Sequence, residues 1–211
     1  MGNPHLYGFT ASTYVQSARW AFEEKEVEYD LVAPPGEGLS SAEYKTIHPF
    51  SRIPALEHDG HHIYETSSIC AYVDEAFDGP LLQPVSILER AHMRQWISVA
   101  TAYLDPAIMR GYVFPYAFAD GDVDQALIDA ALPNCQRYTQ ILDEALEGRQ
   151  FLAGDQLSIA DMMIAPMFRA FGAFKEGAEI LAERPNLSRA LKGWLDWPSF
   201  GATLSEPAKA A

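Results

Sequence analysis

Three residues that carry a carboxylate or a hydroxyl, Glu65, Thr66 and Ser67, stand where a helix is expected to begin. The first N–H groups of a helix have no partner within it, and such side chains are favoured beside them. A short apolar strand, Ile53-Pro54-Ala55-Leu56, comes before them; proline is tolerated at the first residues of a strand or at an edge. Asp59-Gly60 supplies the positive φ angles of a tight hairpin. A strand edge beside a helix N-terminus is suited to hold a small peptide that carries a carboxylate.

The stretch from His48 to Ile69, HPFSRIPALEHDGHHIYETSSI, resembles the glutathione-binding half of the cytosolic glutathione transferase superfamily. There, an apolar residue precedes a cis proline, a hairpin follows, and Glu-Ser or Asp-Ser begins the next helix. Here the last pair is Glu65-Thr66, which keeps a hydroxyl. The resemblance implies that Pro54 is cis. It also implies the glutathione-binding residues: the backbone of Ile53 beside Pro54 for the cysteinyl unit, Glu65 and Thr66 for the γ-glutamyl end, and Arg52 for the glycyl carboxylate or the γ-glutamyl side.

Glutathione reacts through its thiolate, and a free thiol has a pKa of about 8.5, so little of it is ionised at neutral pH. A hydroxyl hydrogen bond and a helix N-terminus both favour the thiolate. In the plant-type (phi) and bacterial members, a motif like L-Y-G-x-x-x-S-P-x-x-V places the activating serine at a helix start. Counted from Tyr7, Ser12 falls on that serine, and Val15 also matches. Thr13 replaces the usual proline and could share or take the role. Tyr7 is the other alternative, because some classes use a tyrosine at the end of the first strand.

Two features of the loops bear on this prediction. The loop after the first strand has no cysteine, which argues against thiol–disulfide exchange and against the cysteine-using members of the superfamily. Phi members carry a His-Lys pair ahead of the second helix that contributes to glutathione binding. Here that region reads Gly38-Leu39-Ser40-Ser41, so this contact is missing.

The residues before the linker predict a βαβαββα order with a thioredoxin-like layout. The expected elements are a strand at 5–9, a helix at 14–27, a strand at 29–32, a short helix at 42–47, the Ile53 and Ile63 hairpin, and a helix at 66–77. A linker with prolines at positions 80 and 84, residues 80–87, follows a first domain of residues 1–79.

Residues 88–211 show only helical patterns and form an expected all-α second domain. One helix is expected from Leu88 to about Tyr116, with Pro106 and Pro115 as bends or breaks. Another is expected at 124–146, with Asp122 or Asp124 as its N-cap. Ser158 begins a third, with Asp161 three residues later as in a capping box, an element that the superfamily also carries.

The electrophile would bind in a pocket between the two domains. Its expected lining is apolar and aromatic, and it consists of Phe9, Met109, Tyr112, Phe114 and Tyr116. Such pockets vary freely on one scaffold, so the sequence does not identify the natural electrophile.

The net charge of -14 and the pI near 4.7 argue against binding to nucleic acid or to anionic membranes, because both depend on Lys and Arg contacts. The sequence has no membrane-length apolar run and no signal peptide, so we expect a cytoplasmic protein. Cys70 and Cys135 are expected to be buried free thiols. Neither the histidines at 58, 61 and 62 nor the aspartates at 120–124 have the spacing of a metal site, so no metal is expected.

These observations predict a glutathione transferase of the detoxification type, a homodimer as the family usually is, that joins glutathione to a hydrophobic electrophile. Two alternatives remain open. The first is a glutathione-dependent isomerase or peroxidase; the Ala11-Ser12-Thr13 loop differs from the Ser-Ser-Cys type of the zeta-class isomerases. The second is a non-catalytic transferase-like module that binds a protein or a ligand.

Overall fold

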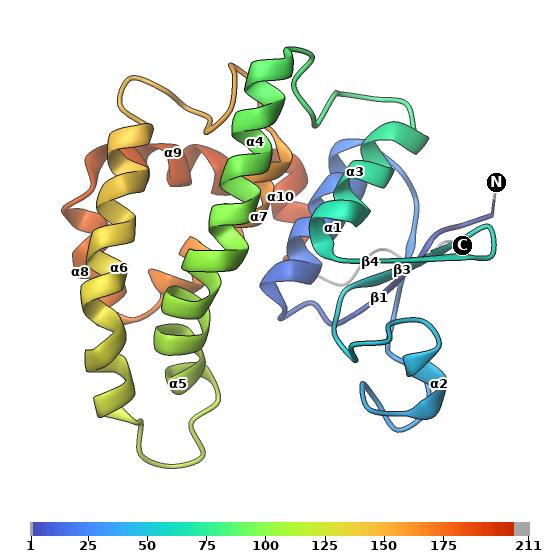
Figure 1. Ribbon diagram of the computed structural model, residues 1–211, viewed down its shortest axis with the longest axis horizontal. Helices are drawn as coiled ribbons and strands as arrows, with labels where there is room; N and C mark the ends of the chain where they lie inside the picture. Colours follow the sequence, from blue (N-terminus) through green and yellow to red (C-terminus); the bar gives the residue numbers. More distant parts are fainter. Residues whose placement is uncertain (1, 205–211) are drawn as a thin grey trace. The chain divides into compact units, whose positions relative to one another are not determined.

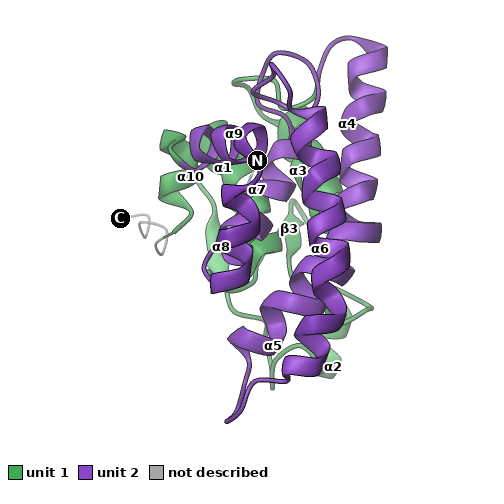
Figure 2. Ribbon diagram, turned by 90° about the vertical axis from the view of Figure 1, so that its left-hand side faces the viewer, with its two compact units in different colours: residues 1–83, 196–211 green, residues 84–195 purple. Residues whose placement is uncertain are grey.

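The chain folds into two compact units, each with its own core (Figures 1 and 2). The structure, a computed structural model, describes residues 2–204. Unit 1 comprises residues 1–83 together with the segment from 196, and unit 2 comprises residues 84–195. The expected domain boundaries at 79 and 88 stay a prediction.

Unit 1 contains a four-stranded mixed sheet with the strand order β2-β1-β3-β4. The strands β1 and β2 are parallel, while β1–β3 and β3–β4 are antiparallel. Its elements are β1 (His5–Tyr7), α1 (Thr13–Glu24), β2 (Asp30–Val32), α2 (Ala42–Lys45), β3 (Ala55–His58), β4 (His61–Tyr64), α3 (Thr66–Ala76) and α10 (Pro198–Ala202). The βαβαββα order and the thioredoxin-like fold are confirmed.

Local chemistry explains the boundaries of these elements. Parallel strands need a crossover connection, and α1 supplies it between β1 and β2. Asp59 and Gly60 have φ angles of 49° and 77°, as a two-residue hairpin turn requires, and they join β3 to β4. β1 is two residues shorter than expected: it ends at Tyr7, and the N–H of Gly8 makes the next bond to the carbonyl of Val32 in β2, at 2.9 Å. A Cβ atom at Gly8 would lie 2.4 Å from a methyl group of Val15, so only glycine allows α1 to begin this close to β1.

The core of unit 1 forms where α1 packs against α3 and against α10. Trp20 of α1 lies edge-on to Phe200 of α10, with ring centroids 4.9 Å apart. The guanidinium of Arg19 is fully buried and donates to Tyr29 Oη and to the carbonyl of Thr203, both at 2.7 Å. Buried charges need such partners, and these contacts hold residues 196–204 in unit 1 although they lie far along the chain.

All regular secondary structure in unit 2, residues 84–195, is helical. Its helices are α4 (Ile87–Val99), the π-helical segment η1 (Ala100–Val113), α5 (Phe114–Ala117), α6 (Gln125–Ala145), α7 (Ile159–Phe171), α8 (Lys175–Ala182) and α9 (Pro185–Leu195). α7 packs against η1, α4 and α9, and its residues 159–168 are all buried. A helix that is apolar all round is typical of a domain interior.

Two helix starts match the sequence. Asp124 caps α6 by accepting from Leu127 N–H at 3.1 Å, and Ser158 forms a capping box with Asp161 at the start of α7. The helix expected from Leu88 to about Tyr116 is also present, because helical backbone continues from Ile87 through Ala117; Pro106 and Pro115 do not break it. In a π-helix the hydrogen bonds join residues five apart, and Pro106, which has no N–H to donate, lies inside this π-helical segment.

Candidate functional site

The register of the sheet brings the three predicted parts of the site to one end of unit 1. Tyr7, the last residue of β1, pairs with Ala55, the first residue of β3. Ala55 in turn pairs with Tyr64, the last residue of β4. The segments that continue from these three residues therefore leave the sheet at the same end. They are the loop 8–12, the Ile53-Pro54 step and the start of α3 at Glu65 and Thr66.

Ser12 is the N-cap of α1, with extended backbone angles of -77° and 125°. Its Oγ accepts from Val15 N–H at 3.4 Å, a long bond. The side chain is half-buried, and no acceptor for its hydroxyl proton lies among residues 2–204. This hydroxyl therefore keeps a proton that it can donate to a ligand at the helix N-terminus.

The other two candidate hydroxyls have different surroundings. Tyr7 is buried, and its hydroxyl donates to Oε2 of Glu57 at 2.7 Å. Burial, followed by this carboxylate, raises the pKa of Tyr7 to about 12. Its ring packs edge-on against Tyr44, with centroids 6.0 Å apart, in the core of unit 1. Thr13 is the first residue of α1 and is only 8% exposed. Of the three side chains, Ser12 is the least enclosed.

The Ile53–Pro54 peptide bond is cis, which confirms the prediction. Ile53 lies just outside the β-ladder, which begins at Ala55, so its backbone groups are not used by the sheet. The preceding residue, Arg52, has an exposed side chain. Its carbonyl accepts from the hydroxyl of Tyr44 at 2.7 Å, which fixes the backbone at this point.

Glu65 stands before α3 with a positive φ angle of 69°, a left-handed conformation that is uncommon for residues other than glycine. Its side chain is exposed and does not cap the helix. Its carboxylate forms no hydrogen bond with another residue between 2 and 204, and it therefore stays available to a ligand. Thr66 is the first helical residue and is 5% exposed. Left-handed backbone at a residue other than glycine, as at Glu65, is often found at ligand sites.

Of the five residues expected to contact the electrophile, one lies in unit 1 and four lie in unit 2. Phe9 in unit 1 is 48% exposed. In unit 2, Met109 is buried, and Phe114 packs edge-on against Phe118, with centroids 5.2 Å apart. Tyr112 is fully buried. Its hydroxyl accepts from Gly177 N–H at 2.8 Å; it and the hydroxyl of Tyr116 donate to the same oxygen of Glu176, at 3.1 and 2.9 Å.

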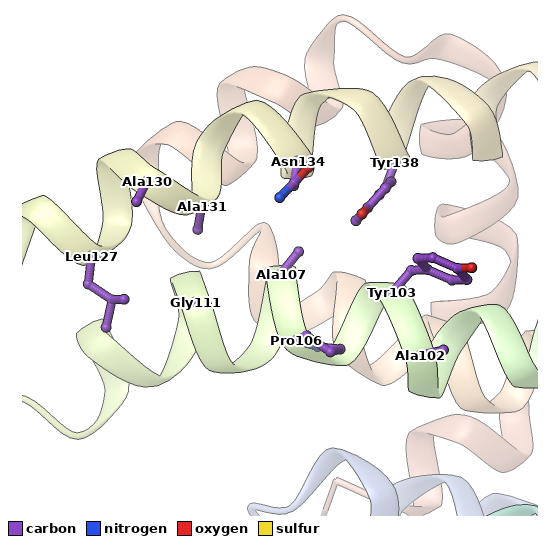
Figure 3. A pocket seen from close by; sticks show the side chains of 10 residues that line it. All are labelled: Ala102, Tyr103, Pro106, Ala107, Gly111, Leu127, Ala130, Ala131, Asn134 and Tyr138. Carbon is purple, nitrogen blue, oxygen red and sulfur yellow. The ribbon is translucent and has the colours of Figure 1, made fainter.

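A separate hollow of about 270 Å³ lies between η1 and α6 (Figure 3). Small residues line it from both helices, and Tyr103 and Tyr138 stand together at one end of it. None of the four unit 2 residues expected to contact the electrophile is in its lining, which consists of Ala102, Tyr103, Pro106, Ala107, Gly111, Leu127, Ala130, Ala131, Asn134 and Tyr138.

Both cysteines are buried and free, as predicted, and burial raises the pKa of Cys70 and of Cys135 to about 12. They are therefore poor nucleophiles. Within residues 2–204, no group of three His, Cys, Asp or Glu side chains is placed to hold a metal ion. No helix in this range is long and apolar enough to span a membrane.

Sequence reasoning missed two residues near the site, Glu57 and His48. Glu57, 50 residues further along the chain, accepts the hydrogen bond that the hydroxyl of Tyr7 donates. His48 is 2% exposed and packs against Tyr64, with ring centroids 4.9 Å apart. The position of His48 immediately before Pro49 marks a turn, but its contact with Tyr64 depends on the folded sheet.

Comparison with known proteins identifies the family. The N-terminal and C-terminal domains of glutathione S-transferases match residues 6–81 and 104–194. A probable glutathione S-transferase from Nicotiana tabacum is 27% identical over 90% of this chain and 82% of its own. Glutathione transferase GST 23 from Zea mays is 30% identical over 75% of this chain and 68% of its own. Glutathione transferase F2 from Populus trichocarpa superposes with a TM-score of 0.87 at 25% identity, over 95% and 97% of the chains. The chain therefore belongs to the glutathione S-transferase family of enzymes.

Proposed function

We propose that this enzyme conjugates the thiolate of glutathione to a hydrophobic electrophilic small molecule, with Ser12 as the residue that activates the thiol. The observation that carries the proposal is the position of Ser12. Its half-buried hydroxyl stands at the N-terminus of α1, with a proton free to donate, at the end of the sheet where Ile53 and Glu65 also lie.

The chemistry needed from Ser12 is modest. A free thiol has a pKa of about 8.5, and lowering it by about two units corresponds to about 2.7 kcal/mol in favour of the thiolate. One donated hydrogen bond to a charged acceptor contributes about 1.5 to 3 kcal/mol. The partial positive charge at the start of α1 adds to this in the same direction. A hydroxyl donor and a helix start together supply the required free energy.

The surroundings of the other two hydroxyls support the choice of Ser12. The hydroxyl of Tyr7 already donates to Glu57, and its raised pKa makes it a weaker donor. Thr13 is more enclosed than Ser12.

Glutathione carries two carboxylates and one ammonium, and unit 1 offers groups that suit each. The exposed carboxylate of Glu65 suits the γ-glutamyl ammonium, and the unpaired N–H groups where α3 begins at Thr66 suit the adjacent carboxylate. The backbone of Ile53, outside the ladder beside the cis Pro54, suits the cysteinyl unit. Arg52 supplies an exposed cation for a carboxylate.

As candidates for contact with the electrophile we propose Phe9 within unit 1 and, separately, Met109, Tyr112, Phe114 and Tyr116 within unit 2. These side chains are apolar or aromatic, as pockets for hydrophobic small molecules usually are. We further propose a cytoplasmic homodimer, as is usual for the family. No nucleic acid, membrane or metal enters the mechanism, and glutathione is the co-substrate.

The test measures conjugation of glutathione to an activated aryl chloride by the purified enzyme. Turnover that saturates with glutathione is expected, and Ser12→Ala should lower kcat/KM by about 10- to 100-fold, the equivalent of a charge-assisted hydrogen bond. An organic hydroperoxide and an isomerisable double bond are assayed in parallel. Turnover of only one of these would favour the peroxidase or the isomerase alternative, and no turnover without glutathione binding would favour a non-catalytic module.

A further inference from the structure

His48 is buried at the corner where α2, the 49–53 loop and β4 meet. It is 2% exposed. Its ring lies against Tyr64, with centroids 4.9 Å apart and planes at 34°, and edge-on to Phe50 at 6.4 Å. Tyr44 of α2 is also 6.4 Å away. A histidine enclosed by three aromatic rings has little freedom to change its orientation.

His48 closes the turn 48–51 with both its backbone and its side chain. Its carbonyl accepts from Ser51 N–H at 2.9 Å. Its Nδ1 accepts from the N–H of Phe50, two residues further along, at 3.3 Å. Asn and Asp side chains commonly bond a backbone N–H two residues later, and here a histidine nitrogen takes that place. The turn leads directly into Arg52 and Ile53, which the proposed function assigns to glutathione.

The ring of His48 also reaches the second half of the same site. Tyr64, which packs on His48, is the last residue of β4 and directly precedes Glu65. A single buried ring therefore contacts both the backbone that leads to Arg52 and the residue that precedes Glu65. Both segments lie at the ligand end of the sheet.

We infer that His48 is a positioning residue of the glutathione site, and that it holds the 48–51 turn only while its ring is neutral. The inference rests on the proposed function, because the ligand whose binding it affects is glutathione. The neutral ring accepts at Nδ1 and carries its proton on Nε2. The protonated ring has an N–H on both nitrogens, so Nδ1 would then face the N–H of Phe50 with no lone pair to offer.

The surroundings of His48 set the direction of its titration. Burial lowers the pKa of His48 from its usual value near 6.5, and Arg52 acts in the same direction, while Glu65 opposes them. The titratable or charged groups that face the ring are the phenols of Tyr44 and Tyr64, Arg52 on its own loop, and Glu65 at the start of α3. The ring is therefore mostly neutral at pH 6.5 and above, and the turn loses its acceptor only as the pH falls through the lowered pKa of His48.

The test uses S-methylglutathione, which has no thiol to titrate, and measures its binding by calorimetry from pH 8 down to the pH at which an NMR titration shows the His48 ring to be protonated. Wild type should bind about fivefold more weakly with the ring protonated than at pH 8, the loss expected for one hydrogen bond. His48→Asn offers an acceptor oxygen at the δ position and does not titrate, so its affinity should change much less over this range. His48→Phe keeps a ring but offers no acceptor, so it should bind weakly at every pH.

Three results would count against the inference. One is wild-type binding that stays the same when the His48 ring becomes protonated, and another is an equal pH dependence in His48→Asn, since other groups would then cause it. The third is wild-type affinity at pH 8 in a folded His48→Phe variant. If that variant does not fold, the comparison of wild type with His48→Asn decides alone. Failure of the wild type to bind at pH 8 would instead contradict the proposed function, so the two failures are distinguishable.

Discussion

The hydroxyl of Tyr7 donates a 2.7 Å hydrogen bond to Oε2 of Glu57 on the neighbouring strand β3. This contact fixes the phenol at a carboxylate and, together with burial, raises the pKa of Tyr7 to about 12. A phenol already used in this way is poorly suited to stabilise a thiolate as well. The pairing of Tyr7 with Glu57 therefore favours the hydroxyl of Ser12, at the start of α1, for that role.

The first prediction compares the three hydroxyls. Ser12→Ala should lower the ionised fraction of bound glutathione while changing its affinity by less than about threefold, because the lost hydrogen bond acts mainly on the charged thiolate. Thr13→Ala and Tyr7→Phe, the matched controls, should keep the thiolate. The measurement is the pH dependence of kcat/KM for the electrophile at saturating glutathione in the four proteins, which reports the pKa of the bound thiol. A retained low thiol pKa in Ser12→Ala, with its loss in Tyr7→Phe, would transfer the role to Tyr7.

The second prediction concerns the carboxylate of Glu65. Glu65→Gln keeps the shape of the side chain but removes the charge that suits the γ-glutamyl ammonium. The glutathione KM should rise about tenfold, in the range of a hydrogen bond between charged groups, while kcat changes little. Glu28→Gln, also an exposed position in unit 1, is the matched control and should leave KM unchanged. A fall in kcat with an unchanged KM would remove Glu65 from the binding role.

The third prediction tests the buried carboxylate of Asp161. It accepts from Leu152 N–H at 2.9 Å and from Ser158 N–H and Oγ–H at 2.9 and 2.8 Å. Asp161→Asn turns an NH₂ group toward one of these donors and should reduce the free energy of unfolding by about 2 to 4 kcal/mol. Asp155→Asn, at an exposed position of the same loop, should change it by less than about 0.5 kcal/mol.

The pH dependence of this effect has a definite sign. Burial raises the pKa of Asp161 from 3.8 to about 6. Between these values the folded state binds more protons than the unfolded state, so the contribution of this group to stability falls as the pH rises from 4 to 6. The gap between wild type and Asp161→Asn should therefore be wider at pH 4.5 than at pH 7.5. A narrower gap at pH 4.5 would mean that the three hydrogen bonds outweigh burial and lower the pKa.

The fourth prediction concerns the buried ion pair of Lys25 and Asp74. Their charged atoms are 2.9 Å apart, and the side chains are 1% and 4% exposed. Lys25 Nζ also donates to the carbonyls of Asp74 and Phe77, at 3.0 and 3.2 Å. Lys25→Met should reduce the free energy of unfolding by about 3 to 4 kcal/mol, because it leaves a buried carboxylate without its cation.

Chemical denaturation of Lys25→Met and of the exposed Lys45→Met measures this effect. The control should stay within about 0.5 kcal/mol of wild type. A change of under about 1 kcal/mol in Lys25→Met would show that the N–H of Leu82, which donates to Asp74 at 2.9 Å, satisfies the carboxylate without the lysine.

Local signals predicted much of this fold. Asp59-Gly60 specified the hairpin, and Asp124 and Ser158 marked helix starts, because turns and caps depend on residues close in sequence. The π-helical stretch around Pro106 could not be predicted, since local pattern predicts a helix without its hydrogen-bond type. The hydrogen bond from Tyr7 to Glu57 and the packing of His48 on Tyr64 depend on the strand register, which residues close in sequence do not determine.

The most direct test of the central claim is an ultraviolet difference spectrum of glutathione added to the purified enzyme at neutral pH, in parallel with Ser12→Ala. A thiolate band in the wild type, strongly reduced in Ser12→Ala while calorimetry shows retained binding, is the predicted result. A band of equal size in both proteins would contradict the assignment of Ser12. If neither a band nor binding occurs in the wild type, the proposed conjugation of glutathione is wrong.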